Sequence, residues 1–265
     1  MASSSTSAIA AGAAAGLAGA VYCSCASGSS AAEQGLATDS VAAFDMSDYI
    51  AARQRGEEPG EEALAVCRAM ADYIHRTGIL VIRDPRVSSE DNDGFLDLLQ
   101  RYYAQPREAL MEDARPDIHY QVGVTPDNVE TAVCASDAKC KAEIAAMSPE
   151  HRPLQPTGPD PKWRFFWRIG ERPDADKTEF ADLNAAPVIP KAFAGEWEGT
   201  MDDWGNKVLS ATMTVAEMLA EGFGEQRDAF TSRMHLGPHL LAPTGGDLAR
   251  CAATATASIR TAASS

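Results

Sequence analysis

The hydrophobic and polar positions form their clearest pattern between residues 62 and 110. Apolar side chains recur there at three- and four-residue spacing, which predicts a helix with one apolar face. Those side chains are Leu64, Cys67, Met70 or Ala71, and Ile74. Thr77-Gly78 ends the helix, because glycine readily adopts the left-handed conformation of a C-terminal cap. The apolar, mostly β-branched run at 79–82 then predicts a strand that is buried throughout.

A second helix is predicted after the break at Asp84-Pro85. Ser88 or Ser89 can cap it, and Asp91 lies near its positive end. Its apolar face is formed by Phe95, Leu98, Leu99 and Tyr102. Pro106 ends this helix and starts a further helical turn, since proline fits the first position of a helix. The segment 62–110 is therefore a helix–strand–helix unit, and we expect the rest of the chain to pack around it.

The remaining patterns predict an α+β fold with more helix than strand. Further helices are predicted at 128–147 and 201–223, and strands at 41–44, 79–83, 162–169 and 234–241. Residues 39–248 form the expected folded region. Residues 1–38 are rich in Ala and Ser and are expected to be disordered, as is the tail at 249–265. A targeting peptide within the first segment is the alternative, with 8–22 as its apolar part.

The segment 162–170 is the most unusual in the chain. Trp163, Phe165 and Trp167 alternate with Arg164, Phe166 and Arg168. This alternation predicts a strand with an aromatic face. One interpretation is a substrate-facing wall in which Arg164 and Arg168 bind a small anionic molecule. The other is an edge strand whose arginine stems cover apolar surface.

Composition excludes several classes of function. The net charge is −15 and the pI is about 4.7, which argues against nucleic-acid and anionic-membrane partners. The six cysteines show no paired C-x-x-C spacing of a zinc site. Cys67 fits a small core position. A reduced, cytoplasmic protein is the expectation, and a Cys134–Cys140 disulfide in an oxidising compartment is the alternative.

The ordered elements resemble the N-terminal region of the isopenicillin N synthase-like, Fe(II)- and 2-oxoglutarate-dependent oxygenases. The segments that match family motifs are 41–47, His75, 78–82, 102–108, 221–224 and 228–230. The stretch 234–245 matches a divergent form of the segment that precedes the catalytic strands. The resemblance implies a jelly-roll fold and oxidation of a small molecule. It also adds His239 to Arg164, Trp167 and Arg168 as a substrate-binding candidate.

The catalytic motifs of that family, H-x-D, a later His and R-x-S, are not found in their family positions. The five histidines are followed two residues later by Thr77, Gln121, Pro153, Gly237 and Leu241, none of which is acidic. Arg86-Val87-Ser88 matches R-x-S only in the N-terminal region. His235 and His239 have the spacing of a helical metal pair, but Gly237-Pro238 between them argues against a helix.

The absence of these motifs predicts that this chain holds neither Fe(II) nor 2-oxoglutarate, although both are expected for the full-length family. The chain is then an inactive oxygenase region that is truncated before the catalytic motifs. The alternative is a non-catalytic binding or regulatory module that keeps the oxygenase N-terminal fold.

Overall fold

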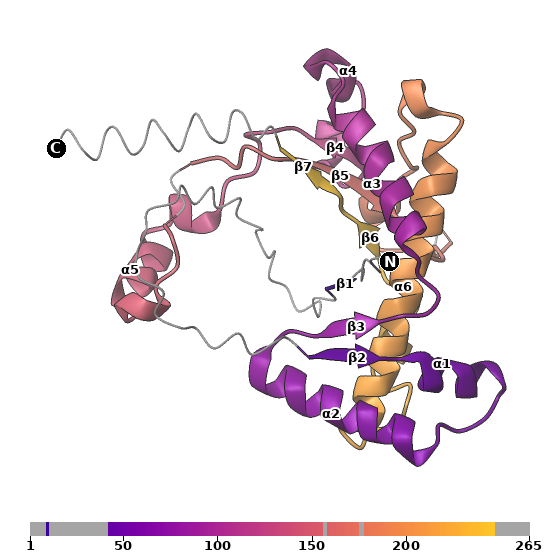
Figure 1. Ribbon diagram of the computed structural model, residues 1–265. Helices are drawn as coiled ribbons and strands as arrows, with labels where there is room; N and C mark the ends of the chain where they lie inside the picture. Colours follow the sequence, from indigo (N-terminus) through magenta and orange to yellow (C-terminus); the bar gives the residue numbers. More distant parts are fainter. Residues whose placement is uncertain (1–8, 11–41, 156–157, 175–177, 247–265) are drawn as a thin grey trace, which may run out of the picture. The chain divides into compact units, whose positions relative to one another are not determined.

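The structure is a computed structural model that describes residues 9–10, 42–155, 158–174 and 178–246 (Figure 1). The chain forms two compact units. The first contains Met1–Asp97, Ile169–Lys177 and Glu198–His239, and the second contains Leu98–Arg168, Thr178–Trp197 and Leu240–Ser265. Except for Ile9–Ala10, the segments expected to be disordered, 1–38 and 249–265, lie outside the described residues.

A small sheet and four helices form most of the first unit. The strands are β1 (Ile9–Ala10), β2 (Ala43–Asp45) and β3 (Val81–Arg83), and their order is β1-β3-β2. β2 is parallel to β3, with Phe44 opposite Ile82, whereas β1 is antiparallel to β3. The helices are α1 (Ser47–Gln54), α2 (Glu61–Thr77), α6 (Trp197–Gly222) and α7 (Thr231–Met234). Figure 1 shows α2 running beside β2 and β3.

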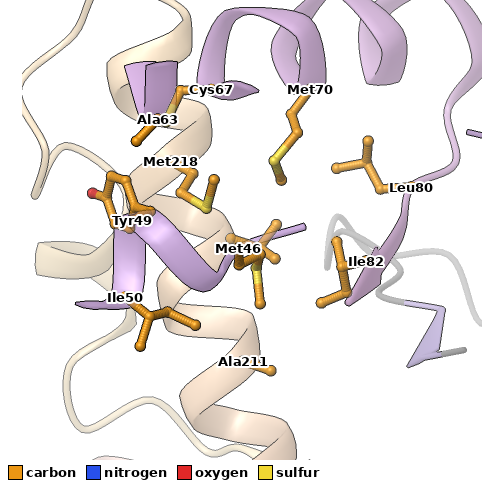
Figure 2. Packing of buried hydrophobic residues seen from close by; sticks show 11 residues of the cluster. Met46, Tyr49, Ile50, Ala63, Cys67, Met70, Leu80, Ile82, Ala211 and Met218 are labelled. Carbon is orange, nitrogen blue, oxygen red and sulfur yellow. The ribbon is translucent and has the colours of Figure 1, made fainter. Parts of the chain in front are cut away.

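The core of the first unit lies where α1, α2, β3 and α6 meet. Met46, Cys67, Met70, Leu80 and Met218 are all fully buried. Figure 2 shows Met46 and Met218 near the middle of this cluster, with Cys67, Met70, Leu80 and Ile82 around them and Tyr49 at its edge. Burial of such side chains is the main favourable contribution to folding. The core therefore joins α6, late in the chain, to the helix–strand segment predicted from the sequence.

The predicted helix–strand–helix unit is confirmed in outline. Gly78 ends α2 with φ 74°, the left-handed conformation expected there. Ser88 caps α3 (Ser89–Tyr103) through a reciprocal pair of hydrogen bonds with Asp91: the Asp91 amide donates to Ser88 Oγ, and the Ser88 amide donates to the Asp91 carboxylate. The prediction that residues 79–82 are all buried was wrong. Ile79 is 58% exposed, whereas Leu80 is fully buried, so burial alternates along this stretch instead of being continuous.

The second unit is organised around β5 (Trp163–Arg168). β5 pairs antiparallel with β4 (Gly123–Thr125), with Val124 opposite Phe165. Its two ends also pair antiparallel with β6 (Leu240–Leu241) and β7 (Thr244–Gly245). The end of α3, α4 (Arg107–Met111), α5 (Ala138–Ala146) and several 3-10 turns complete the unit.

Three predicted elements differ from the observed ones. The strand predicted at 41–44 is β2, Ala43–Asp45. The helix predicted at 128–147 is limited to α5, because the Asp137 side chain caps a helix that begins at Ala138. The strand predicted at 234–241 is wrong over most of its length: α7 ends at Met234, Leu236 has φ 55°, and pairing resumes only at β6.

An aromatic cluster forms the core of the second unit. Tyr102 and Trp197 have ring centroids 4.7 Å apart, and Phe165 lies 4.7 Å from Trp197. Phe193 and Tyr103 complete the cluster around Tyr102. Cys134 and Cys140 form a disulfide in the segment between β4 and β5. Among the helices in the described part of the chain, none has the length and apolar character needed to cross a bilayer.

Candidate functional site

The candidate site predicted from the sequence is centred on β5, and the strand itself is confirmed. Its side chains alternate, with Phe165 and Trp167 buried on one face. β5 is not an edge strand, because β4 lies beside it and β6 and β7 also pair with it. The interpretation of this segment as an edge strand was therefore wrong. The alternation alone could not distinguish a central from an edge position.

Arg164 is held by an acidic residue from outside the strand. Its guanidinium donates to Glu130 Oε2 at 2.6 Å, and the same carboxylate lies 3.6 Å from Lys162 Nζ. Lys162 also pairs with Asp160, and Arg164 stacks over the Phe166 ring at 5.3 Å. The positive charges of Lys162 and Arg164 are thus balanced by two carboxylates. Arg164 already has a carboxylate of the protein as its partner.

Arg168 and Trp167 are almost completely buried, with 3% and 2% of their surfaces exposed. Arg168 Nε donates to Asn184 Oδ1 at 3.4 Å. Because side chains alternate along a strand, Arg164 and Arg168 share one face of β5 while Trp167 lies on the other. The structure thus places the two arginines on a common face and separates Trp167 from them.

His239, the fourth predicted residue, belongs to the first unit. Its Nε2 lies 2.8 Å from the Met234 carbonyl oxygen, and its own carbonyl accepts a hydrogen bond from the Ile169 amide at 3.1 Å. These contacts fix the turn between α7 and β6. The role of Arg164, Trp167, Arg168 and His239 in binding a substrate stays a prediction.

A buried carboxyl group in the second unit was missed by the sequence reasoning. Asp113 is 7% exposed, and its Oδ2 accepts a hydrogen bond of 2.9 Å from the Tyr102 hydroxyl. Burial raises the pKa of Asp113, and the bond from Tyr102 opposes that rise. Asp127 is also buried and pairs with Arg107, whose guanidinium lies 5.0 Å from the Trp163 ring centroid. No sequence motif marks either acid, because their partners are 11 and 20 residues away.

A polar depression of about 240 Å³ lies in the first unit. Its lining residues are Tyr49, Ile50, Arg53, Gln54, Arg86, Thr214 and Glu217. Arg86 donates to both oxygens of Asp84, to Ser210 and to Thr214. This arginine of the R-x-S match is therefore engaged with a protein carboxylate.

Arg53, on the other wall of the depression, pairs with Glu58 and Glu221. Within the described residues, three buried atoms beside this pair have no hydrogen-bond partner: Tyr49 Oη, Arg53 Nε and Glu221 Oε2. Burial raises the pKa of the Tyr49 hydroxyl. The ion pair between Arg53 and Glu221 joins α1 to the end of α6.

The donor set does not fit the iron site of the oxygenases. That site requires two histidines and one carboxylate around a single metal ion. In the described segments, no three His, Cys, Asp or Glu side chains lie close enough together to hold a metal ion. Four of the five histidines are exposed and occupy different elements, and His239 contacts a backbone carbonyl. These residues therefore do not form the Fe(II) site.

Comparison with known proteins shows a likeness in fold alone. No protein-family model and no curated protein sequence matches the chain. A full-length Neurospora crassa protein in complex with alpha-KG matches at 14% identity and a TM-score of 0.51, covering 76% of this chain and 53% of that one. The complex of the same protein with alpha-KG and 5-formyluracil matches at 12% identity and a TM-score of 0.50, covering 76% and 50%.

A 2OG-Fe(II) oxygenase family protein from Caulobacter crescentus matches at 18% identity and a TM-score of 0.53, covering 77% of this chain and 55% of that one. The structural neighbours are thus 2-oxoglutarate/Fe(II) oxygenases, and the mixed α/β fold of this chain is similar to theirs. The chain spans about half the length of the solved structures that it matches.

Proposed function

We propose that this chain is the N-terminal region of a 2-oxoglutarate- and Fe(II)-dependent oxygenase that acts on a small molecule. The fold similarity to two such oxygenases, over about three quarters of the chain, is the observation that carries the proposal. The resemblance of the helix–strand–helix unit and of the 221–230 segment to the isopenicillin N synthase-like subgroup supports it independently. A neighbour that binds 5-formyluracil supports a small molecule as the substrate class.

Fe(II) and 2-oxoglutarate are the cofactors of the complete enzyme in this proposal. Within the described residues no group fits them, since no three His, Cys, Asp or Glu side chains lie close enough together to hold a metal ion. By itself the chain then has no oxygenase activity. Its contribution is the N-terminal framework of the oxygenase fold.

In the same proposal, β5 contributes to binding a small anionic molecule. Arg164 is the residue best able to take part, because it is only partly buried and its partner Glu130 is itself accessible to solvent. An anion would have to replace Glu130 in the contact with Arg164. Trp167 and Arg168 would fix the position of the strand, and His239 would fix the turn between α7 and β6.

The second candidate is a non-catalytic binding module with the same fold. It is favoured by the donor set, in which no metal-binding cluster occurs within the described residues. The two candidates differ in what the gene encodes beyond residue 248. Sequencing of the transcript past that codon tests the first candidate, since an H-x-D, a later His and R-x-S encoded there would support it. Their absence from the transcript would favour the binding module.

A direct test is anaerobic calorimetric titration of the purified chain with Fe(II), with and without 2-oxoglutarate. We expect no stoichiometric binding and no 2-oxoglutarate turnover. The variant His235→Ala/His239→Ala provides the control, because any weak heat that survives it comes from non-specific acidic sites. One-to-one binding at micromolar Fe(II) that is lost in this variant would refute the absence of a metal site.

A further inference from the structure

The disulfide between Cys134 and Cys140 joins a 3-10 turn to the first turn of α5. Cys134 lies in the turn Val133–Ala135, and Cys140 is the third residue of α5. The Cα atoms are 5.1 Å apart, within the range of ordinary disulfides, and six positions separate the residues in sequence. The crosslink therefore closes a very short ring at the start of the helix.

Hydrogen bonds that involve no sulfur hold the same turn. The amides of Ser136 and Asp137 donate to the Val133 carbonyl at 3.1 and 2.9 Å. The Asp137 carboxylate accepts a bond of 2.7 Å from the Cys140 amide, as a helix N-cap does. Because these bonds do not involve the sulfurs, we expect the backbone to keep the two cysteines together in the reduced chain as well. A dithiol held in this way has a high effective concentration of one thiol toward the other.

The surroundings of this pair allow reagents to reach it. Both cysteines are only partly buried, and the neighbouring Val133 is 72% exposed. Cys67 provides the contrast, because it is fully buried and desolvation raises the pKa of its thiol to about 11. Among the cysteines in the described part of the chain, Cys134 and Cys140 are therefore the two that a thiol reagent can reach.

We infer that Cys134 and Cys140 form a reversible dithiol–disulfide pair that fixes the start of α5 in response to the redox state of the compartment. In the oxidising direction, a small external disulfide such as glutathione disulfide is the oxidant. One cysteine thiolate attacks it and releases one glutathione thiolate. The second cysteine thiolate attacks the mixed disulfide and releases the other. The two cysteine protons end on the two glutathione thiols, and the protein gains one sulfur–sulfur bond.

The pair lies in the part of the chain between Asn128 and Asp160, and backbone hydrogen bonds join the two ends of this segment. The Asn128 amide donates to the Asp160 carbonyl, and the Asp160 amide donates to the Glu130 carbonyl, each at 2.8 Å. The Glu130 carboxylate in turn pairs with Arg164 on β5. Oxidation is thus expected to rigidify the part of this segment at α5. Its two ends are expected to stay joined in both the oxidised and the reduced chain.

The test is equilibration of the full chain in glutathione buffers of increasing oxidised fraction, followed by acid quenching, alkylation and tryptic mapping. Trypsin cleaves after Lys139 and Lys141, so the dipeptide Cys140-Lys141 stays attached to the Cys134 peptide only when the bridge exists. We expect one transition within the range of these buffers. Persistence of both thiols in every buffer, or of the bridge in every buffer, would overturn the inference.

Substitution of Asp137 separates a pre-organised pair from an accidental one. Asp137→Ala removes the cap and is expected to lower the effective concentration by about fivefold. Asp137→Asn keeps an acceptor at the cap and should oxidise as the natural chain does. Equal oxidation of the alanine, asparagine and natural chains would contradict pre-organisation by the cap.

Hydrogen exchange over α5 measures the consequence of oxidation. We expect faster exchange at Ala138–Ala146 in the reduced chain than in the oxidised chain, with residues 128–130 unchanged. A Cys134→Ser/Cys140→Ser variant should exchange like the reduced chain in both buffers. If α5 exchanges equally fast in the oxidised and reduced natural chain, the crosslink does not control the helix.

Discussion

At the residue scale, the contrast between Ile79 and Leu80 shows what composition alone does not determine. Both are large and apolar and lie next to each other, so the sequence predicted burial for both. Leu80 is fully buried in the core of the first unit, and Ile79 is 58% exposed. Burial alternates here, so Leu80 and Ile82 face the core, whereas Ile79 and Arg83 lie on the exposed side. An apolar run in the sequence therefore does not show which of its residues face the core.

Asp113 leads to a prediction about pH. Its pKa is raised by burial, so the native state binds this proton more tightly than the unfolded chain does. Its contribution to stability is therefore fully present below its unfolded pKa and is lost as pH rises through its raised native pKa. Asp113→Asn keeps an acceptor for the Tyr102 hydroxyl and removes the ionisation. We expect the unfolding free energy of this variant, relative to the natural chain, to increase from pH 4 to pH 7.

Urea unfolding at several pH values measures that difference. Tyr102→Phe provides the matched control, because it removes the hydrogen bond that opposes the rise in the Asp113 pKa. Its stability should fall more steeply with pH than that of the natural chain. A stability difference between Asp113→Asn and the natural chain that does not change with pH would contradict a raised pKa at Asp113.

At the element scale, the sequence predicted the long helices better than the short strands. α2, α3 and α6 each repeat their apolar spacing over several turns, so the period is readable. β6 and β7 have two residues each and carry no period of their own. The candidate site was limited for a related reason. Arg164 was found by its alternation, but its partner Glu130 is 34 residues away and becomes visible only once the loop between β4 and β5 is folded.

Gly222 tests how tightly α6 is packed against α2. A Cβ atom at this position would lie 2.2 Å from the Cys67 carbonyl oxygen and 2.9 Å from Ala71 Cβ, so the two helix backbones would have to separate. We expect Gly222→Ala to lower the unfolding free energy by roughly 1–3 kcal/mol. Thermal and urea unfolding provide the measurement.

The same substitution at Gly94, within α3, should change the unfolding free energy in the opposite direction. No atom lies within 4 Å of a Cβ placed there, so only the helix preference for alanine remains. Gly94→Ala is therefore expected to stabilise the chain by roughly 0.5–1 kcal/mol. Equal effects of the two substitutions would mean that α6 does not approach α2 as closely as the structure describes.

At the scale of the whole molecule, the charge excess is the property best determined by the sequence. The chain has 38 acidic and 23 basic residues. The structure shows that many of the basic side chains form ion pairs with carboxylates. Arg53, Arg86 and Lys207 pair with carboxylates in the first unit, and Arg107, Arg164 and Lys191 do so in the second. Such pairing reduces the positive potential that these groups would present to a polyanion.

This distribution predicts that the chain does not bind nucleic acid or anionic vesicles at physiological salt. Binding to a polyanion depends on releasing its counterions to a basic face, and both the net charge and the ion pairs oppose such a face. Fluorescence anisotropy of labelled duplex and single-stranded DNA, and sedimentation with phosphatidylserine vesicles, should give no saturable signal up to micromolar protein. A basic protein of similar size, measured alongside, confirms that each assay responds. Saturable binding that weakens steeply with salt would mean that the acidic residues are segregated so as to leave a basic face. Arg164 and Lys162 would then be the first residues to substitute, since both lie on or beside the central strand of the second unit.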